Sequence, residues 1–229
     1  MPILPWLAHL YTSIGIVIAL LATAVTFAHN FRAAFLYLFA AIIIDATDGM
    51  LARALRVKER LPQFDGALLD NIIDYQTYVF VPALIVWQAH LVPQAFPICS
   101  AMAVSSLYGF SRTDAKGEGA DYYFTGFPSY WNIVVVYLYM FQLPLRVNAI
   151  VLGLLAVMVF VPIHYLYPSR MRRLRAATMM LGTMWGVLLV WMLWRLPAVD
   201  GPWTALSLIF PAYYVALSLW MQAGRRAGK

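Results

Sequence analysis

The feature that most constrains this chain is a series of apolar runs, each about 16 to 21 residues long, which together occupy most of its 229 residues. Runs of this length match the hydrocarbon core of a bilayer. Charged residues make up only 11% of the chain, whereas a water-facing protein carries about 25%. The runs are continuous rather than alternating, which excludes an outer-membrane barrel. The chain is therefore predicted to be a polytopic membrane protein in contact with the lipid bilayer.

Eight runs qualify as candidate spans, and helix is the expected state because lipid offers the backbone no hydrogen-bond partners. They cover residues 10–28, 33–52, 67–87, 95–110, 131–145, 149–167, 176–194 and 203–221. No repeat or linker divides the chain. We expect an all-α fold: a polytopic integral membrane helical bundle of about eight transmembrane helices, built as a single domain over residues 1–229.

The orientation follows from the basic residues when successive loops are assigned to alternate sides. Thirteen of the sixteen Lys and Arg residues then fall on one side, and only Arg32, Arg146 and Arg195 fall on the other. Basic loops stay in the cytoplasm, so both termini are predicted to be cytoplasmic. The net charge of +6 accordingly indicates basic loops beside anionic lipid, not a nucleic-acid partner.

Carboxylates lie in two of these runs, where ionisable side chains are costly and usually functional. Asp45 and Asp48 are three residues apart, while Gly66, Asp70 and Asp74 recur every four. Each set therefore shares one helical face. The loop between the two runs brings both stripes to the same membrane surface, so the four carboxylates are expected to converge. An all-oxygen ligand set favours Mg²⁺ or Mn²⁺, with Ca²⁺ also compatible, and two such ions can bridge a diphosphate.

The neighbouring residues suit a phosphate ligand. Gly49 and Gly66 remove side chains where a nucleotide can approach the helices closely, and Arg53 offers a planar fork for phosphate oxygens. An alternative remains in which the acids form ion pairs with loop arginines or relay protons in a transporter.

These residues form a pattern that resembles the signature of the CDP-alcohol phosphotransferase family. The pattern is Asp45-x2-Asp48-Gly49-x2-Ala52-Arg53, twelve residues, then Gly66-x3-Asp70-x3-Asp74. The gap of twelve is longer than is usual in the family and is similar to that of its bacterial phosphatidylcholine synthase branch. Residues 124–132 (FTGFPSYWN) and 161–170 (VPIHYLYPSR) resemble that branch too.

The resemblance implies an enzyme of the bacterial inner membrane, with its active site facing the cytoplasm, that converts CDP-diacylglycerol and choline into phosphatidylcholine and CMP by direct displacement. It implies Asp45, Asp48, Asp70 and Asp74 as ligands of Mn²⁺ or Mg²⁺, with two ions expected, and Asp74 also as the catalytic base. It implies that Gly49, Ala52, Arg53 and Gly66 bind CDP-diacylglycerol. Asp65 has no counterpart in the signature. Related enzymes are often homodimers, which leaves a homodimer open for this chain.

Choline is a quaternary ammonium, which proteins recognise through aromatic faces. The predicted choline-binding residues are Tyr123, Tyr130, Trp131 and Tyr75, although an interfacial aromatic belt explains the same residues. Arg112 is predicted to contact a substrate phosphate, and positive-inside topology explains it equally well. Two functional alternatives remain open: the same chemistry with serine, inositol phosphate or glycerol phosphate as the acceptor, and an ion-coupled transporter.

Overall fold

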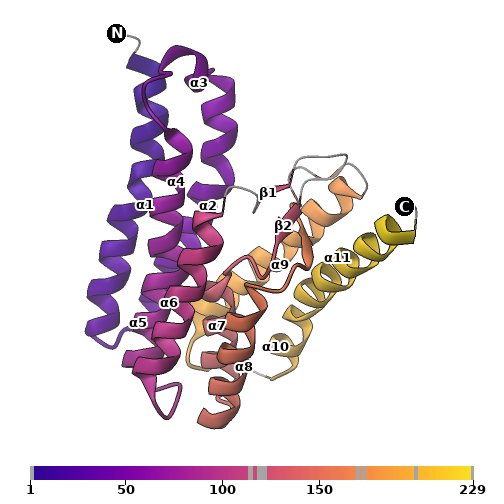
Figure 1. The fold of residues 1–229 in the computed structure, drawn as a ribbon. Helices are drawn as coiled ribbons and strands as arrows, with labels where there is room; N and C mark the ends of the chain where they lie inside the picture. The colour runs from indigo at the N-terminus through magenta and orange to yellow at the C-terminus, as the bar shows by residue number, and fades with distance from the viewer. Residues whose placement is uncertain are drawn as a thin grey trace.

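The structure is a computed structural model that describes residues 3–112, 116–117, 123–168, 171, 174–198 and 201–227. It is mostly helical (Figure 1). Four helical segments are long and apolar enough to cross a membrane, namely Ile3–Phe27, Phe31–Ala54, Arg175–Arg195 and Gly201–Ala223. Shorter apolar helices cover Ala95–Ser111, Trp131–Phe141 and Leu145–Met158.

The first two helices form an antiparallel hairpin, α1 (Ile3–Phe27) and α2 (Phe31–Ala54), at one side of the bundle (Figure 1). Asn30 begins α2, where its side chain accepts a hydrogen bond from the Ala33 backbone N–H at 3.2 Å. Small buried residues of α1, including Ala8, Ala19 and Ala22, let neighbouring backbones approach closely. The hairpin confirms the first two predicted runs as helices.

The third predicted run is helical but not uniform. After α3 (Val57–Arg60), the chain forms α4 (Gly66–Asp74), a π-helical stretch η1 (Tyr75–Phe80) and α5 (Val81–Gln88) without a break. Pro82 gives the physical reason, because proline has no backbone N–H and crowds the carbonyl four residues earlier. The Val81 N–H bonds the carbonyl of Gln76, five residues before it. The wide turn therefore follows directly after Asp74.

The remaining predicted runs are helical for most of their length, but two of them, the fifth and the sixth, end earlier than predicted. The fourth run becomes α6 (Ala95–Ser111), and the fifth ends early as α7 (Trp131–Phe141) because Gln142 adopts a left-handed conformation with φ of 47°. After α8 (Leu145–Met158) come α9 (Arg175–Arg195), α10 (Gly201–Ser207) and α11 (Ile209–Ala227). The eighth predicted run is thus divided between α10 and α11.

A small antiparallel sheet corrects the all-α expectation. It contains β1 (Lys116–Gly117), β2 (Tyr123–Thr125) and β3 (His164–Leu166), in the order β1-β2-β3. The sixth predicted run, which extended to residue 167, is wrong at its end because the helix stops at Met158 and the chain turns into β3. Gly126 joins the two segments: its N–H donates to the Ile163 carbonyl at 2.8 Å.

The core lies between α2, α5, α6, α7, α8 and α9. Fully buried side chains from each of them meet there, including Phe35, Ile85, Met102, Trp131, Leu152 and Leu189. Large apolar side chains are also exposed on the outer faces of the helices, as with Leu20 at 70%, Ile150 at 69% and Trp194 at 70%. An apolar exterior of this kind is what lipid-facing helices require.

Candidate active site

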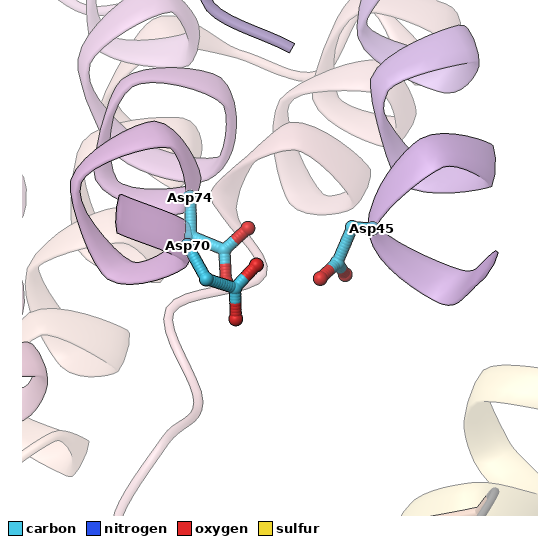
Figure 2. A group of neighbouring side chains, drawn as sticks. All are labelled: Asp45, Asp70 and Asp74. Atoms are coloured by element: carbon cyan, nitrogen blue, oxygen red, sulfur yellow. The ribbon is translucent and has the colours of Figure 1, made fainter. Parts of the chain in front are cut away.

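Three carboxylates face one another between α2 and α4. Asp70 and Asp74 project from one helix toward Asp45 on the other (Figure 2). One carboxylate oxygen from each residue lies within 4.8 Å of the others, and all three side chains are partly buried. Oxygens on opposite sides of an octahedral Mg²⁺ are about 4.2 Å apart, and those around Ca²⁺ lie somewhat further apart. The arrangement can therefore hold a divalent cation with little movement.

The fourth acid, Asp48, lies beside this group and not within it. It is 7% exposed and accepts a hydrogen bond from Thr12 Oγ1 of α1 at 2.8 Å. Asp48 nevertheless lines the same small cavity as the other three acids. That cavity has a volume of about 10 Å³, which is close to the space that one water molecule occupies. The structure thus brings three of the four predicted acids together and places the fourth at the cavity wall.

A tyrosine orients the acid of α2. Tyr78 Oη donates to Asp45 Oδ2 at 2.7 Å, and the Tyr78 side chain is only 8% exposed. Tyr78 lies in the π-helical stretch that follows Asp74, and such widened turns are frequent at functional sites. A hydrogen bond to a carboxylate is among the stronger ones, so Tyr78 fixes the position of Asp45.

Asp65, which has no place in the signature, starts the helix that carries Asp70 and Asp74. Its side chain accepts hydrogen bonds from the backbone N–H groups of Ala67 and Leu68, both at 3.0 Å. An N-cap of this type stabilises a helix by about 1 kcal/mol. The sequence contained the signal, since an Asp directly before the first turn of an apolar helix is a typical start.

Helix α1 also contributes to the site, which the sequence analysis missed. Thr12 and Gly15 both line the acid cavity. At Gly15, an added Cβ would lie 2.6 Å from Ile73 Cγ2, so glycine is what allows α1 to approach α4. The spacing of Thr12 and Gly15 puts both on one helical face, but nothing local indicated which helix this face would meet.

The predicted nucleotide residues lie on both sides of the α2–α4 connection. The Arg53 guanidinium covers Gly49, with Nη1 3.2 Å from the position of a Cβ there. Ala52 packs against the small buried cluster of Ala8, Val57 and Leu61. At Gly66, the space that glycine leaves open is taken by His9, whose Cε1 lies 2.8 Å from the Cβ position. The structure therefore brings all four residues to the same end of the helices.

Comparison with known proteins identifies the family. The sequence profile for CDP-alcohol phosphatidyltransferase matches residues 5–220. The chain belongs to this family. It is 35% identical over 224 residues to a phosphatidylcholine synthase of Legionella pneumophila, an alignment that covers 94% of this chain and 87% of the relative. It is 37% identical to a phosphatidylcholine synthase of Pseudomonas aeruginosa, with 95% and 92% covered. A Bradyrhizobium diazoefficiens phosphatidylcholine synthase is 38% identical, with 92% and 78% covered.

Membership gives the acid cluster a chemical context. CDP-alcohol phosphatidyltransferases use divalent metal ions. The oxygen-only donor set and the spacing of Asp45, Asp70 and Asp74 fit such an ion.

Three aromatic residues predicted for choline contact other parts of this CDP-alcohol phosphatidyltransferase. Trp131 is fully buried, and its indole Nε1 donates to Ser106 Oγ at 2.7 Å. Tyr123 packs against His164 within the sheet, with ring centroids 4.1 Å apart. Tyr75 faces α6, where its hydroxyl donates to the Ala103 carbonyl at 3.0 Å.

Tyr130 is the predicted aromatic residue that the structure places beside the acids. Its ring centroid lies 6.0 Å from that of Tyr78 and 6.5 Å from that of Tyr214. Burial raises the pKa of the Tyr130 phenol, and the negative charge of Asp45 raises this pKa further. The hydroxyl therefore stays protonated, and the three tyrosines form an aromatic group next to Asp45.

Arg112, the predicted contact with a substrate phosphate, lies against an aromatic ring. Arg112 follows α6 and lies over the Tyr108 ring, 5.7 Å from its centroid. Its role toward a substrate phosphate stays a prediction. The cations Arg170, Arg172 and Arg173, which contribute to the predicted orientation, lie outside the described residues.

Proposed function

We propose that this enzyme transfers the phosphatidyl group of CDP-diacylglycerol to choline, which gives phosphatidylcholine and CMP. The observation that carries this proposal is the acid group of Asp45, Asp70 and Asp74 in a chain that is similar over most of its length to proteins named phosphatidylcholine synthase. The family match over residues 5–220 supports the reaction class.

Each part of the site has a task in this reaction. Asp45, Asp48 and Asp70 would hold the metal ions, together with Asp74. A bound divalent cation supplies positive charge that offsets the charge of the diphosphate and of departing CMP. Arg53 would bind phosphate oxygens through its planar fork. Gly49, Ala52 and Gly66 would bind the nucleotide part of CDP-diacylglycerol together with Arg53.

Asp74 is proposed as the general base. It takes the proton of the choline hydroxyl as the choline oxygen attacks the phosphorus that carries diacylglycerol. The bond from this phosphorus to the CMP oxygen breaks, and CMP leaves with the electron pair. In a single displacement of this kind the phosphatidyl group passes directly from CMP to choline, without a covalent intermediate on the enzyme.

For the acceptor, the structure favours the tyrosine group over the other predicted aromatics. Tyr130, Tyr78 and Tyr214 lie together beside Asp45, so an ammonium there would meet ring faces and a carboxylate at once. Trp131 is a core residue with its indole already bonded. We therefore propose Tyr130 as the main choline contact among the predicted residues.

We propose eight spans, formed by α1, α2, the α4–η1–α5 rod, α6, α7, α8, α9 and the α10–α11 pair, in a single domain. The N-terminus lies at the same end of the bundle as α3 (Figure 1). The loop around α3 contains Arg56, Lys58 and Arg60, so positive-inside topology puts this end, and both termini, in the cytoplasm. The protein would then sit in the bacterial inner membrane with its site facing the cytoplasm. A homodimer stays a prediction.

The test is turnover by purified protein in detergent. CDP-diacylglycerol, Mn²⁺ and labelled choline should yield labelled phosphatidylcholine, and serine in place of choline should yield no product. Turnover with serine and none with choline would contradict the proposed acceptor. The transporter alternative predicts substrate flux in proteoliposomes without CMP release.

A further inference from the structure

His9 is a buried polar side chain that has no role in the proposed reaction. It lies on α1 and is 8% exposed. Its ring packs against Phe64, with centroids 4.3 Å apart, and edge-on to Trp6 at 6.0 Å. Its Nε2 is buried and has no hydrogen-bond partner within the part of the chain that the structure describes. Such a group destabilises a folded protein, which calls for an explanation.

The polar edge of the His9 ring lies against Gly66 at the start of α4. The Cε1, Nδ1 and Nε2 atoms lie 2.8, 3.4 and 3.9 Å from the position where a Cβ of Gly66 would stand. Gly66 comes one helical turn before Asp70, a separation of about 6 Å along the axis of α4. His9 is therefore one turn from the acid group, on the side where Arg53 and Ala52 also lie.

The neighbours of His9 connect it to the same site. Three residues further along α1, Thr12 donates to Asp48, and His9 and Thr12 share a helical face. Ala8, just before His9, belongs to the small buried cluster against which Ala52 of α2 packs. The imidazole thus occupies the corner between α1, the end of α2 and the start of α4, next to the residues proposed for the nucleotide.

From this position we infer that His9 is a nucleotide-binding residue, whose Nε2 forms a hydrogen bond with the cytidine nucleotide part of CDP-diacylglycerol. The inference rests on the proposed function, because a nucleotide must occupy the corner beside Gly66 and Arg53. It adds a contact with the nucleotide from α1, the helix that also places Thr12 against Asp48. It also explains why a polar ring stands between two aromatic residues with its nitrogen unpaired.

The test compares CMP binding to the wild type and to His9→Phe, measured by calorimetry in detergent with Mn²⁺. Phenylalanine keeps the ring and its packing but removes both nitrogens. The dissociation constant for CMP is expected to rise roughly 10- to 100-fold, as for the loss of a hydrogen bond to a charged or strongly polar group. The melting temperature without nucleotide should stay the same or rise, because an unpartnered buried group is removed.

Phe64→Leu is the matched control, since it alters packing beside the imidazole and retains the nitrogen. Its CMP affinity should stay near that of the wild type. Equal CMP affinity in the wild type and His9→Phe would overturn the inference and leave the proposed function intact. An equal loss of CMP affinity in His9→Phe and Phe64→Leu would do the same, and so would a lower melting temperature of nucleotide-free His9→Phe. A wild-type protein that binds no CMP would overturn the proposed function itself, and His9 with it.

Discussion

Tyr78→Phe, which removes one hydroxyl group, should weaken metal binding without disturbing the fold. The Tyr78 hydroxyl donates to Asp45 at 2.7 Å, and Asp45 belongs to the group that can hold a cation. Tyr78→Phe keeps the ring, which is 8% exposed and packed near Tyr130. The substitution therefore removes the positioning of one proposed ligand and leaves the packing in place.

The size of the effect follows from the chemistry of the contact. A hydrogen bond to a charged group contributes about 1.5 to 3 kcal/mol, which corresponds to roughly 10- to 150-fold in an equilibrium constant. Mutation of a residue that hydrogen-bonds a metal ligand typically lowers metal affinity or activity by about 10- to 100-fold. We expect the Mn²⁺ concentration for half-maximal turnover to rise by about 10- to 100-fold in Tyr78→Phe.

The assay is CMP release from CDP-diacylglycerol and choline, measured over a Mn²⁺ titration. Tyr139→Phe is the control, because Tyr139 packs against Phe31 and Phe35 and its hydroxyl has no hydrogen-bond partner among the described residues. Its Mn²⁺ dependence should match that of the wild type. An unchanged Mn²⁺ dependence in Tyr78→Phe would refute the idea that Asp45 needs this tyrosine to act as a ligand.

Two further substitutions test other parts of the structure. Asp74→Asn should lower turnover by about 100-fold or more while CDP-diacylglycerol binding stays measurable, and near-normal turnover would exclude Asp74 as the base. Gly126→Ala should lower the melting temperature, with a loss of more than about 1 kcal/mol of stability, because Gly126 has φ of +85° and its Cβ would lie 2.1 Å from the Val159 carbonyl oxygen. Gly153→Ala is the control for that measurement, since nothing lies within 4 Å of its Cβ position and alanine favours a helix. Equal melting temperatures of the two variants would contradict the requirement for glycine at position 126.

The helices and the acid stripes could be predicted because their signals are local. The length of an apolar run identifies a membrane helix. A spacing of three residues places Asp45 and Asp48 on one helical face, and a spacing of four does the same for Asp70 and Asp74. The Asp65 cap was also readable from its place before an apolar helix. These features depend only on residues within a few positions of one another.

The sheet and the side-chain partners could not be predicted, because they depend on contacts between distant segments. Strands of two or three residues, such as β1 and β3, are too short to show an alternating pattern. Thr12 reaches Asp48 across 36 positions in the chain, and Tyr78 reaches Asp45 across 33. The aromatic density near residue 130 could not separate Trp131, a core residue, from Tyr130 beside the acids.

Asp45, Asp70 and Asp74 are proposed to form the divalent-metal site of this enzyme. Electron paramagnetic resonance of Mn²⁺ added to purified protein with CMP measures the binding of an ion there. We expect a bound-Mn²⁺ signal in the wild type and its loss, together with the loss of CMP release, in Asp70→Asn. A bound-Mn²⁺ signal that is the same in Asp70→Asn and the wild type would contradict the claim.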